Sequence, residues 1–133
     1  MTVNSKILIV EDEIIVAIDL QQRLENMNYN VVGIAGNGDE AIRKTEEFKP
    51  DIILMDIMLK GDLDGIKTAQ IIHDLHNSSV IYLSGSHDKN VLERAKTTEP
   101  HGYINKPFDD TGIQNAIQIA INNTKMSQNI LKS

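Results

Sequence analysis

The chain has 133 residues, a formal net charge of −6 at pH 7 and no cysteine, which suits one domain with a single core and excludes a disulfide framework, a thiolate nucleophile and a zinc-finger site. Its 13 lysine and arginine residues form no run or stripe, which argues against a nucleic-acid-binding surface. The first apolar run, Ile7–Val10, is too short for a signal-peptide core or a membrane span, so we expect a cytoplasmic protein that contacts no membrane.

The first predicted element is a strand over Lys6–Val10, which is followed at once by the acidic run Glu11–Glu13. A short, continuous apolar run is typical of a strand that is buried on both faces in a parallel sheet. After the acidic run the apolar spacing becomes helical. We expect the buried face of this helix to consist of its apolar residues Ile14, Ile15, Ile18 and Leu24.

The rest of the chain alternates strands and helices that are joined by short links. Further strands are predicted over Asn30–Ala35, Asp51–Asp56, Ser79–Leu83 and Gly102–Asn105. Further helices are predicted over Asp39–Phe48, Ile66–His76, Lys89–Thr98 and Ile113–Asn122. Asp64 is well placed to cap the helix that begins at Ile66.

Alternation of this kind implies right-handed βαβ crossovers and an open parallel sheet. We therefore predict an α/β fold of the flavodoxin-like, doubly wound (βα)5 type, whose five parallel strands have the order 2-1-3-4-5. The whole chain, residues 1–133, is expected to be one domain with its core over residues 5–123 and a polar tail over residues 124–133.

Four of the predicted strands deliver polar side chains at their carboxyl ends. The first gives Glu11 and Asp12, the third Asp56, the fourth Ser84 and the last Lys106. In a doubly wound sheet the first and third strands flank the topological switch point, where a crevice opens. Three carboxylates cannot lie close together without a cation, and an all-oxygen site with room for water suits Mg²⁺ better than Ca²⁺. Such a site would also leave a nucleophilic carboxylate beside an ion that can neutralise an incoming phosphoryl group.

The motifs that carry these residues strongly resemble the receiver domain of two-component response regulators. The matching segments are Ile7–Asp12, Asp51–Asp56, Asp64-Gly65, Tyr82–Gly85 and Gly102–Phe108. The resemblance implies that Asp56 accepts a phosphoryl group from a phosphohistidine on a histidine kinase or a histidine phosphotransferase. It implies that the chain is not an enzyme acting on other molecules, but a domain that catalyses its own phosphorylation and dephosphorylation.

The resemblance also implies a metal site with a defined ligand set. Asp12 and Asp56 would ligate Mg²⁺ directly, whereas Glu11 would act mostly through water. The backbone carbonyl of Met58 would supply a further ligand.

The remaining implied roles concern the phosphoryl group and its readout. Ser84 would hydrogen-bond a phosphoryl oxygen, and Lys106, which is expected to precede a cis peptide bond to Pro107, would pair with the phosphate. Tyr103 resembles the family's switch aromatic and would turn inward when Ser84 moves. The surface formed by the last two helices and the last strand would then contact an output partner or a second copy of the chain.

Two positions depart from the commoner pattern of the family. Many receivers have proline four residues after the phosphoacceptor, where this chain has Lys60, and Gly61-Asp62-Leu63 makes the loop slightly longer. Ser84 replaces the more frequent threonine but keeps the hydroxyl group.

Other functions fit the sequence less well. In an FMN-binding flavodoxin, Glu11-Asp12-Glu13 would repel the phosphate, and a haloacid dehalogenase-type phosphatase would need aspartate where Met58 stands. A pseudo-receiver that binds partners without being phosphorylated is the rival of another class, although such domains typically lose an acidic-pocket residue or the lysine. The histidines show no metal-ligand spacing and are expected to be exposed: His73, His76, His87 and His101.

Overall fold

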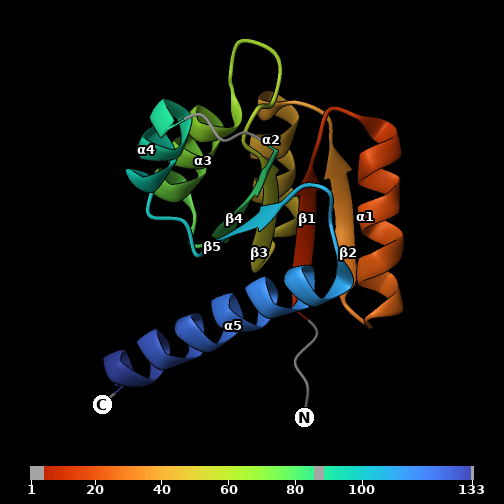
Figure 1. Cartoon of the computed structure of the whole chain (residues 1–133). Helices are drawn as coiled ribbons and strands as arrows, with labels where there is room; N and C mark the ends of the chain where they lie inside the picture. Colours follow the sequence, from red (N-terminus) through yellow and green to blue (C-terminus); the bar gives the residue numbers. More distant parts are fainter. Residues whose placement is uncertain (1–4, 86–88, 133) are drawn as a thin grey trace.

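The computed structural model describes the backbone of residues 5–85 and 89–132 and the side chains of residues 5–85 and 89–123. A five-stranded parallel sheet with the order β2-β1-β3-β4-β5 forms its centre (Figure 1). The strands are β1 (Lys6–Val10), β2 (Asn30–Ala35), β3 (Ile52–Asp56), β4 (Ser79–Ser84) and β5 (Gly102–Asn105). The helices are α1 (Ile14–Asn26), α2 (Gly38–Phe48), α3 (Gly65–Leu75), α4 (Lys89–Lys96) and α5 (Asp110–Lys132). The predicted fold class and strand order are confirmed.

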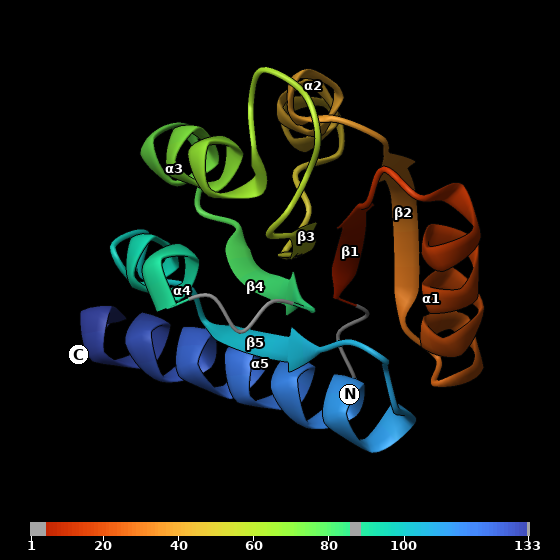
Figure 2. The ribbon, with the colours of Figure 1, turned by 45° about the horizontal axis from the view of Figure 1, so that its top comes forward.

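Helices cover both faces of the sheet, with α1 and α5 on one side and α2, α3 and α4 on the other (Figure 2). Successive residues of a strand point to opposite faces. In β1, Leu8 and Val10 accordingly join the core under α2 and α3, whereas Ile7 and Ile9 join the core under α1 and α5. Both faces of the central strands are therefore largely apolar, and their charged side chains lie at the strand ends.

The buried face of α1 includes Leu24, as predicted, but not the three predicted isoleucines. Ala17, Leu20 and Leu24 are fully buried, whereas Ile14, Ile15 and Ile18 are 60%, 81% and 44% exposed. The two stripes lie side by side, because about 100° separates successive residues around a helix. The stripe through Ile14 and Ile18 continues into polar residues, so burying it would expose Leu20 and Leu24 over the last two turns. The leucine stripe therefore packs on the sheet and the isoleucines face outward.

Helix α3 agrees with the prediction, whereas α4 and α5 differ from it at their carboxyl ends. Asp64 caps α3 as expected, since its Oδ1 accepts the Lys67 N–H at 2.8 Å, and α3 ends at Leu75 with His76 as its carboxyl-terminal cap. Helix α4 ends at Lys96, and the hydroxyl of Thr98 donates to the carbonyl of Ala95 just beyond it. Helix α5 runs from residue 110 to residue 132, so the backbone of the predicted polar tail continues the helix. No proline or glycine follows residue 112 to stop it.

Candidate functional site

The ends of β1 and β3 bring three carboxylates together. The two strands are neighbours in the sheet, with Val10 beside Met55, so the residues after them emerge at the same edge. Each of Glu11, Asp12 and Asp56 offers a ligand oxygen, and these oxygens lie within 4.8 Å of one another. Glu11 and Asp56 are buried and Asp12 is half-buried. The three predicted carboxylates thus form one cluster at this edge of the sheet, which we call the crevice.

The backbone of Gly65 packs closely against the backbone of Asp56. Gly65, the first residue of α3, lies so near that a Cβ atom on it would overlap the carbonyl oxygen of Asp56. Only glycine permits this distance without a shift of the backbone. The start of α3 is therefore packed directly against the end of β3.

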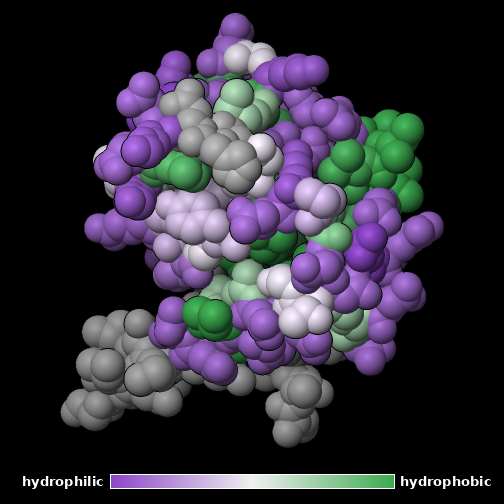
Figure 3. Space-filling model, viewed as in Figure 1, coloured by the Kyte–Doolittle hydropathy of each residue, from purple (hydrophilic) through white to green (hydrophobic). Residues whose placement is uncertain are grey.

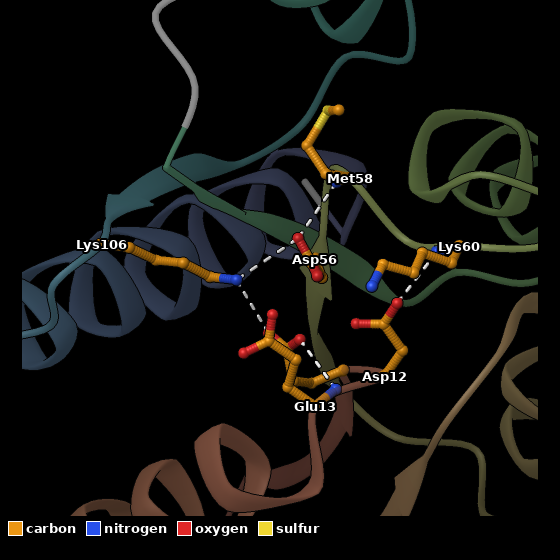
Figure 4. Close-up of polar contacts among 7 residues, drawn as sticks. Asp12, Glu13, Asp56, Met58, Lys60 and Lys106 are labelled. Carbon is orange, nitrogen blue, oxygen red and sulfur yellow. Dashed lines mark hydrogen bonds and ion pairs between the residues drawn. The ribbon is translucent and has the colours of Figure 1, made fainter.

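Lys106 enters the crevice from the loop after β5, and Figure 4 shows its side chain directed toward Asp56. Its Nζ donates to Glu11 Oε2 at 3.0 Å and lies 3.5 Å from Asp56 Oδ1. The peptide bond that follows, to Pro107, is cis as expected. The ammonium group of Lys106 thus lies between the carboxylates of Glu11 and Asp56.

Each carboxylate also accepts a hydrogen bond from a backbone N–H group, as drawn in Figure 4. The Glu13 N–H donates to Glu11 Oε1 at 3.2 Å, the Met58 N–H to Asp56 Oδ1 at 3.0 Å, and the Lys60 N–H to Asp12 Oδ2 at 3.2 Å. Donors of this kind stabilise the charged form of a carboxylate and fix the direction of its oxygens.

The electrostatics of the crevice are dominated by burial. The pKa of Glu11 is raised to about 7: burial is the largest cause, the charge of Asp56 adds to it, and the hydrogen bond from Lys106 opposes both. Burial also acts to lower the pKa of Lys106, but its hydrogen bond to Glu11 and the charges of both carboxylates outweigh that effect and raise it. The ammonium therefore stays charged and only partly compensates the acidic cluster.

The donor set of the crevice fits a hard divalent cation. All three side chains offer oxygen, the ligand that Mg²⁺ prefers, and the half-buried Asp12 leaves a side open to water. The cluster has three carboxylates and one ammonium group, so its negative charge exceeds what Lys106 neutralises. An added cation would relieve that repulsion.

Ser84 is the last residue of β4, and Tyr103 lies in β5, which pairs with β4. Ser84 is buried, pairs with Asn105 in register, and accepts the Lys106 N–H at its carbonyl at 2.9 Å. Tyr103 is 39% exposed and borders a hollow of about 570 Å³ between α4 and β5, which Ser84 and Leu92 also line. The two residues therefore line one hollow.

One buried polar contact was missed by the sequence analysis. The ring of Tyr82 lies under that of Tyr103, with centroids 6.0 Å apart and planes at 35°. The Tyr82 hydroxyl is 2.6 Å from that of Thr98 and fully buried, and burial raises the pKa of Tyr82 to about 12. A tyrosine inside an otherwise apolar strand was the available signal, because a buried phenol needs a hydrogen-bond partner.

The described histidines are not part of the acidic cluster. His73 and His101 are exposed as expected, His76 is half-buried rather than exposed, and His87 is outside the described residues. The first three line a hollow of about 400 Å³ near the amino end of β4. Within the described part of the chain, their nitrogens join no group of three or more metal-ligating side chains.

A doubly wound parallel domain with carboxylates at the switch point and a lysine between them defines a class of signalling domain. The chain belongs to the response regulator receiver domain family, whose model matches residues 7–118. It is therefore a receiver domain of the kind found in two-component systems.

Individual proteins support this assignment. The chain is similar to the transcriptional regulatory protein PdtaR of Mycobacterium tuberculosis, with 33% identity over 119 residues that make up 90% of this chain and 58% of PdtaR. It is 36% identical over 120 residues to the response regulator protein VraR of Staphylococcus saprophyticus, covering 89% of this chain and 57% of VraR. The chain thus spans less than two thirds of the length of these relatives.

A solved structure matches over nearly its full length. The signal receiver domain of a modulated diguanylate cyclase from Desulfovibrio desulfuricans G20 superimposes with a TM-score of 0.88 at 38% identity, covering 92% of this chain and 98% of that one. None of the helices among the described residues is long and apolar enough to cross a membrane.

Proposed function

We propose that this chain, acting as one domain, accepts a phosphoryl group on Asp56 from a phosphohistidine of a histidine kinase or a histidine phosphotransferase, with Mg²⁺ as cofactor. The observation that carries the proposal is the convergence of Glu11, Asp12 and Asp56 around the ammonium of Lys106. A pseudo-receiver would not need to keep so much like charge buried in one crevice.

In the proposed step, an oxygen of Asp56 attacks the phosphorus of the donor. The new O–P bond forms as the N–P bond breaks, and the imidazole keeps the electron pair and takes up a proton. The Met58 N–H and Lys106 Nζ both contact Oδ1 of Asp56, which leaves Oδ2 as the attacking oxygen. After transfer, Lys106 pairs with the phosphoryl group and the Ser84 hydroxyl donates to one of its oxygens.

Mg²⁺ bound by Asp12 and Asp56 directly, by Glu11 mostly through water and by the Met58 carbonyl would neutralise charge on the phosphoryl oxygens. The side chains hold their places without it, because backbone N–H groups and Lys106 already orient them. The chain's own contribution is therefore a preorganised acidic crevice with one nucleophilic carboxylate.

The exposed isoleucines of α1 support a protein phosphodonor. Ile14, Ile15 and Ile18 begin directly after the acidic loop, and Figure 3 shows a hydrophobic patch on the side of the molecule where α1 lies. An apolar patch at the rim of the crevice suits a donor that must bring a phosphohistidine up to Asp56. A small phosphodonor would gain nothing from it.

Asp56→Asn tests the acceptor. Incubation with Mg²⁺ and a small phosphodonor should add one base-labile phosphate to wild type and none to Asp56→Asn, as measured by intact mass. Asp62→Asn, in the exposed loop, is the matched control and should be phosphorylated like wild type. Phosphate on Asp56→Asn at the wild-type level would refute the assignment, and none on wild type would favour the pseudo-receiver.

The proposed output is a change at the surface formed by α4, β5 and α5, which would contact an output partner or a second copy. A phosphoryl group draws Ser84 toward Asp56, and Tyr103 follows into the vacated space. Hydrogen exchange with and without a beryllofluoride mimic should change at this surface in wild type and change less in Ser84→Ala. Changes confined to α1 would contradict this switch.

A further inference from the structure

The three backbone donors of the crevice are not equivalent. The donors to Glu11 and Asp56 belong to residues two positions further along the chain, so each contact is local. The donor to Asp12 is the N–H of Lys60, 48 residues away in the loop between β3 and α3. The direction of the Asp12 carboxylate therefore depends on where that loop lies.

The contact uses the backbone of Lys60 and not its ammonium group. Any residue except proline has the N–H that this hydrogen bond requires. A proline at this position would leave Asp12 Oδ2 without the donor. The departure from proline thus has a direct structural consequence at the crevice.

The next residue sets the shape of the loop. Gly61 has φ of +113°, a conformation that L residues rarely adopt, although a Cβ there would meet no atom within 4 Å. The requirement for glycine is therefore one of backbone conformation alone. The turn at Gly61 follows directly on the N–H that Asp12 accepts.

We propose that the backbone N–H of Lys60 is a positioning group for the metal site, which holds one oxygen of Asp12 so that the other faces the crevice. This inference rests on the proposed function, since it concerns the cation that Asp12 would bind. Hydrogen bonds to metal-ligating carboxylates typically change metal affinity about 10- to 100-fold. The bond to Asp12 is 3.2 Å long and exposed, so we expect an effect of about 3- to 10-fold.

The experiment is a Mg²⁺ titration of the full chain, followed by amide chemical shifts, in wild type, Lys60→Ala and Lys60→Pro. Lys60→Ala keeps the N–H and should bind Mg²⁺ within about twofold of wild type, whereas Lys60→Pro should bind about 3- to 10-fold more weakly. Equal affinity in Lys60→Pro and wild type would overturn the inference. So would an equal loss in both variants, since the side chain would then be the cause.

A second measurement covers the case in which Lys60→Pro does not fold. Without Mg²⁺, the amide proton of Lys60 should move upfield in Asp12→Ala because it loses its acceptor, while the amide of Met58 keeps its own. An unmoved Lys60 amide would overturn the inference. A wild-type chain whose crevice amides ignore Mg²⁺ would instead overturn the proposed function, and this inference with it.

Discussion

The buried carboxyl of Glu11 should make the metal-free protein less stable as the pH rises. Its pKa is about 7 in the folded chain against an ordinary value of 4.5, so the folded state binds this proton more tightly than the unfolded state does. The free energy of unfolding therefore falls as the pH rises from the unfolded pKa through the folded one, and levels off above it.

The size of the effect follows from the two pKa values. Between pH 5.5 and pH 8 the loss from this one group amounts to about 2 kcal/mol. Its physical source is a carboxylate that burial deprives of water and that Asp56 repels, with Lys106 compensating in part.

Urea unfolding followed by circular dichroism, with EDTA present, tests this between pH 5.5 and pH 8. Glu11→Gln has no proton to lose and should lack the fall, while histidine contributions are common to both proteins and cancel in the comparison. Glu13→Gln, at an exposed neighbour, should keep the wild-type slope. Equal slopes in wild type and Glu11→Gln would refute the reasoning.

Two further predictions concern the packing around the site. Tyr82→Phe removes a buried hydroxyl 2.6 Å from that of Thr98 and should cost about 1 kcal/mol of unfolding free energy, and a cycle with Thr98→Val should show coupling. Additive losses would contradict the contact. Gly65→Ala places a Cβ against the Asp56 carbonyl and should cost more than about 2 kcal/mol in the same assay. Gly36→Ala meets no atom and should be nearly neutral, and similar losses in the two alanine variants would argue against the close approach.

The fold could be predicted because two features of the sequence indicate each strand: a short apolar run and the polar residues that end it. In β3 every residue is buried, and Asp56 closes the strand. The carboxylates and Lys106 were found for the same reason, since each follows directly on a strand and parallel strands end at one edge.

The orientation of α1 could not be predicted from spacing, because two apolar stripes lie side by side on it. The number of isoleucines favoured the stripe through Ile14 and Ile18, but only the stripe through Leu20 and Leu24 runs the length of the helix. Contacts made by loop backbone were equally hidden. The hydrogen bond from the Lys60 N–H to Asp12 lies next to a turn at Gly61. Its donor is a backbone group, so the residue type at position 60 does not reveal it.

Burial is the larger cause of the raised pKa of Glu11, and the charge of Asp56 adds to it. Three carboxylates that lie this close together repel one another, and the single ammonium of Lys106 cannot neutralise them. The two apolar cores on the two faces of the sheet stabilise the fold and offset this repulsion. Any species that brings positive charge to the crevice, or that draws Lys106 away from Glu11, changes this balance. A phosphoryl group on Asp56 would do the second, because Nζ would then have a stronger anion within reach than the carboxylate it now contacts at 3.0 Å.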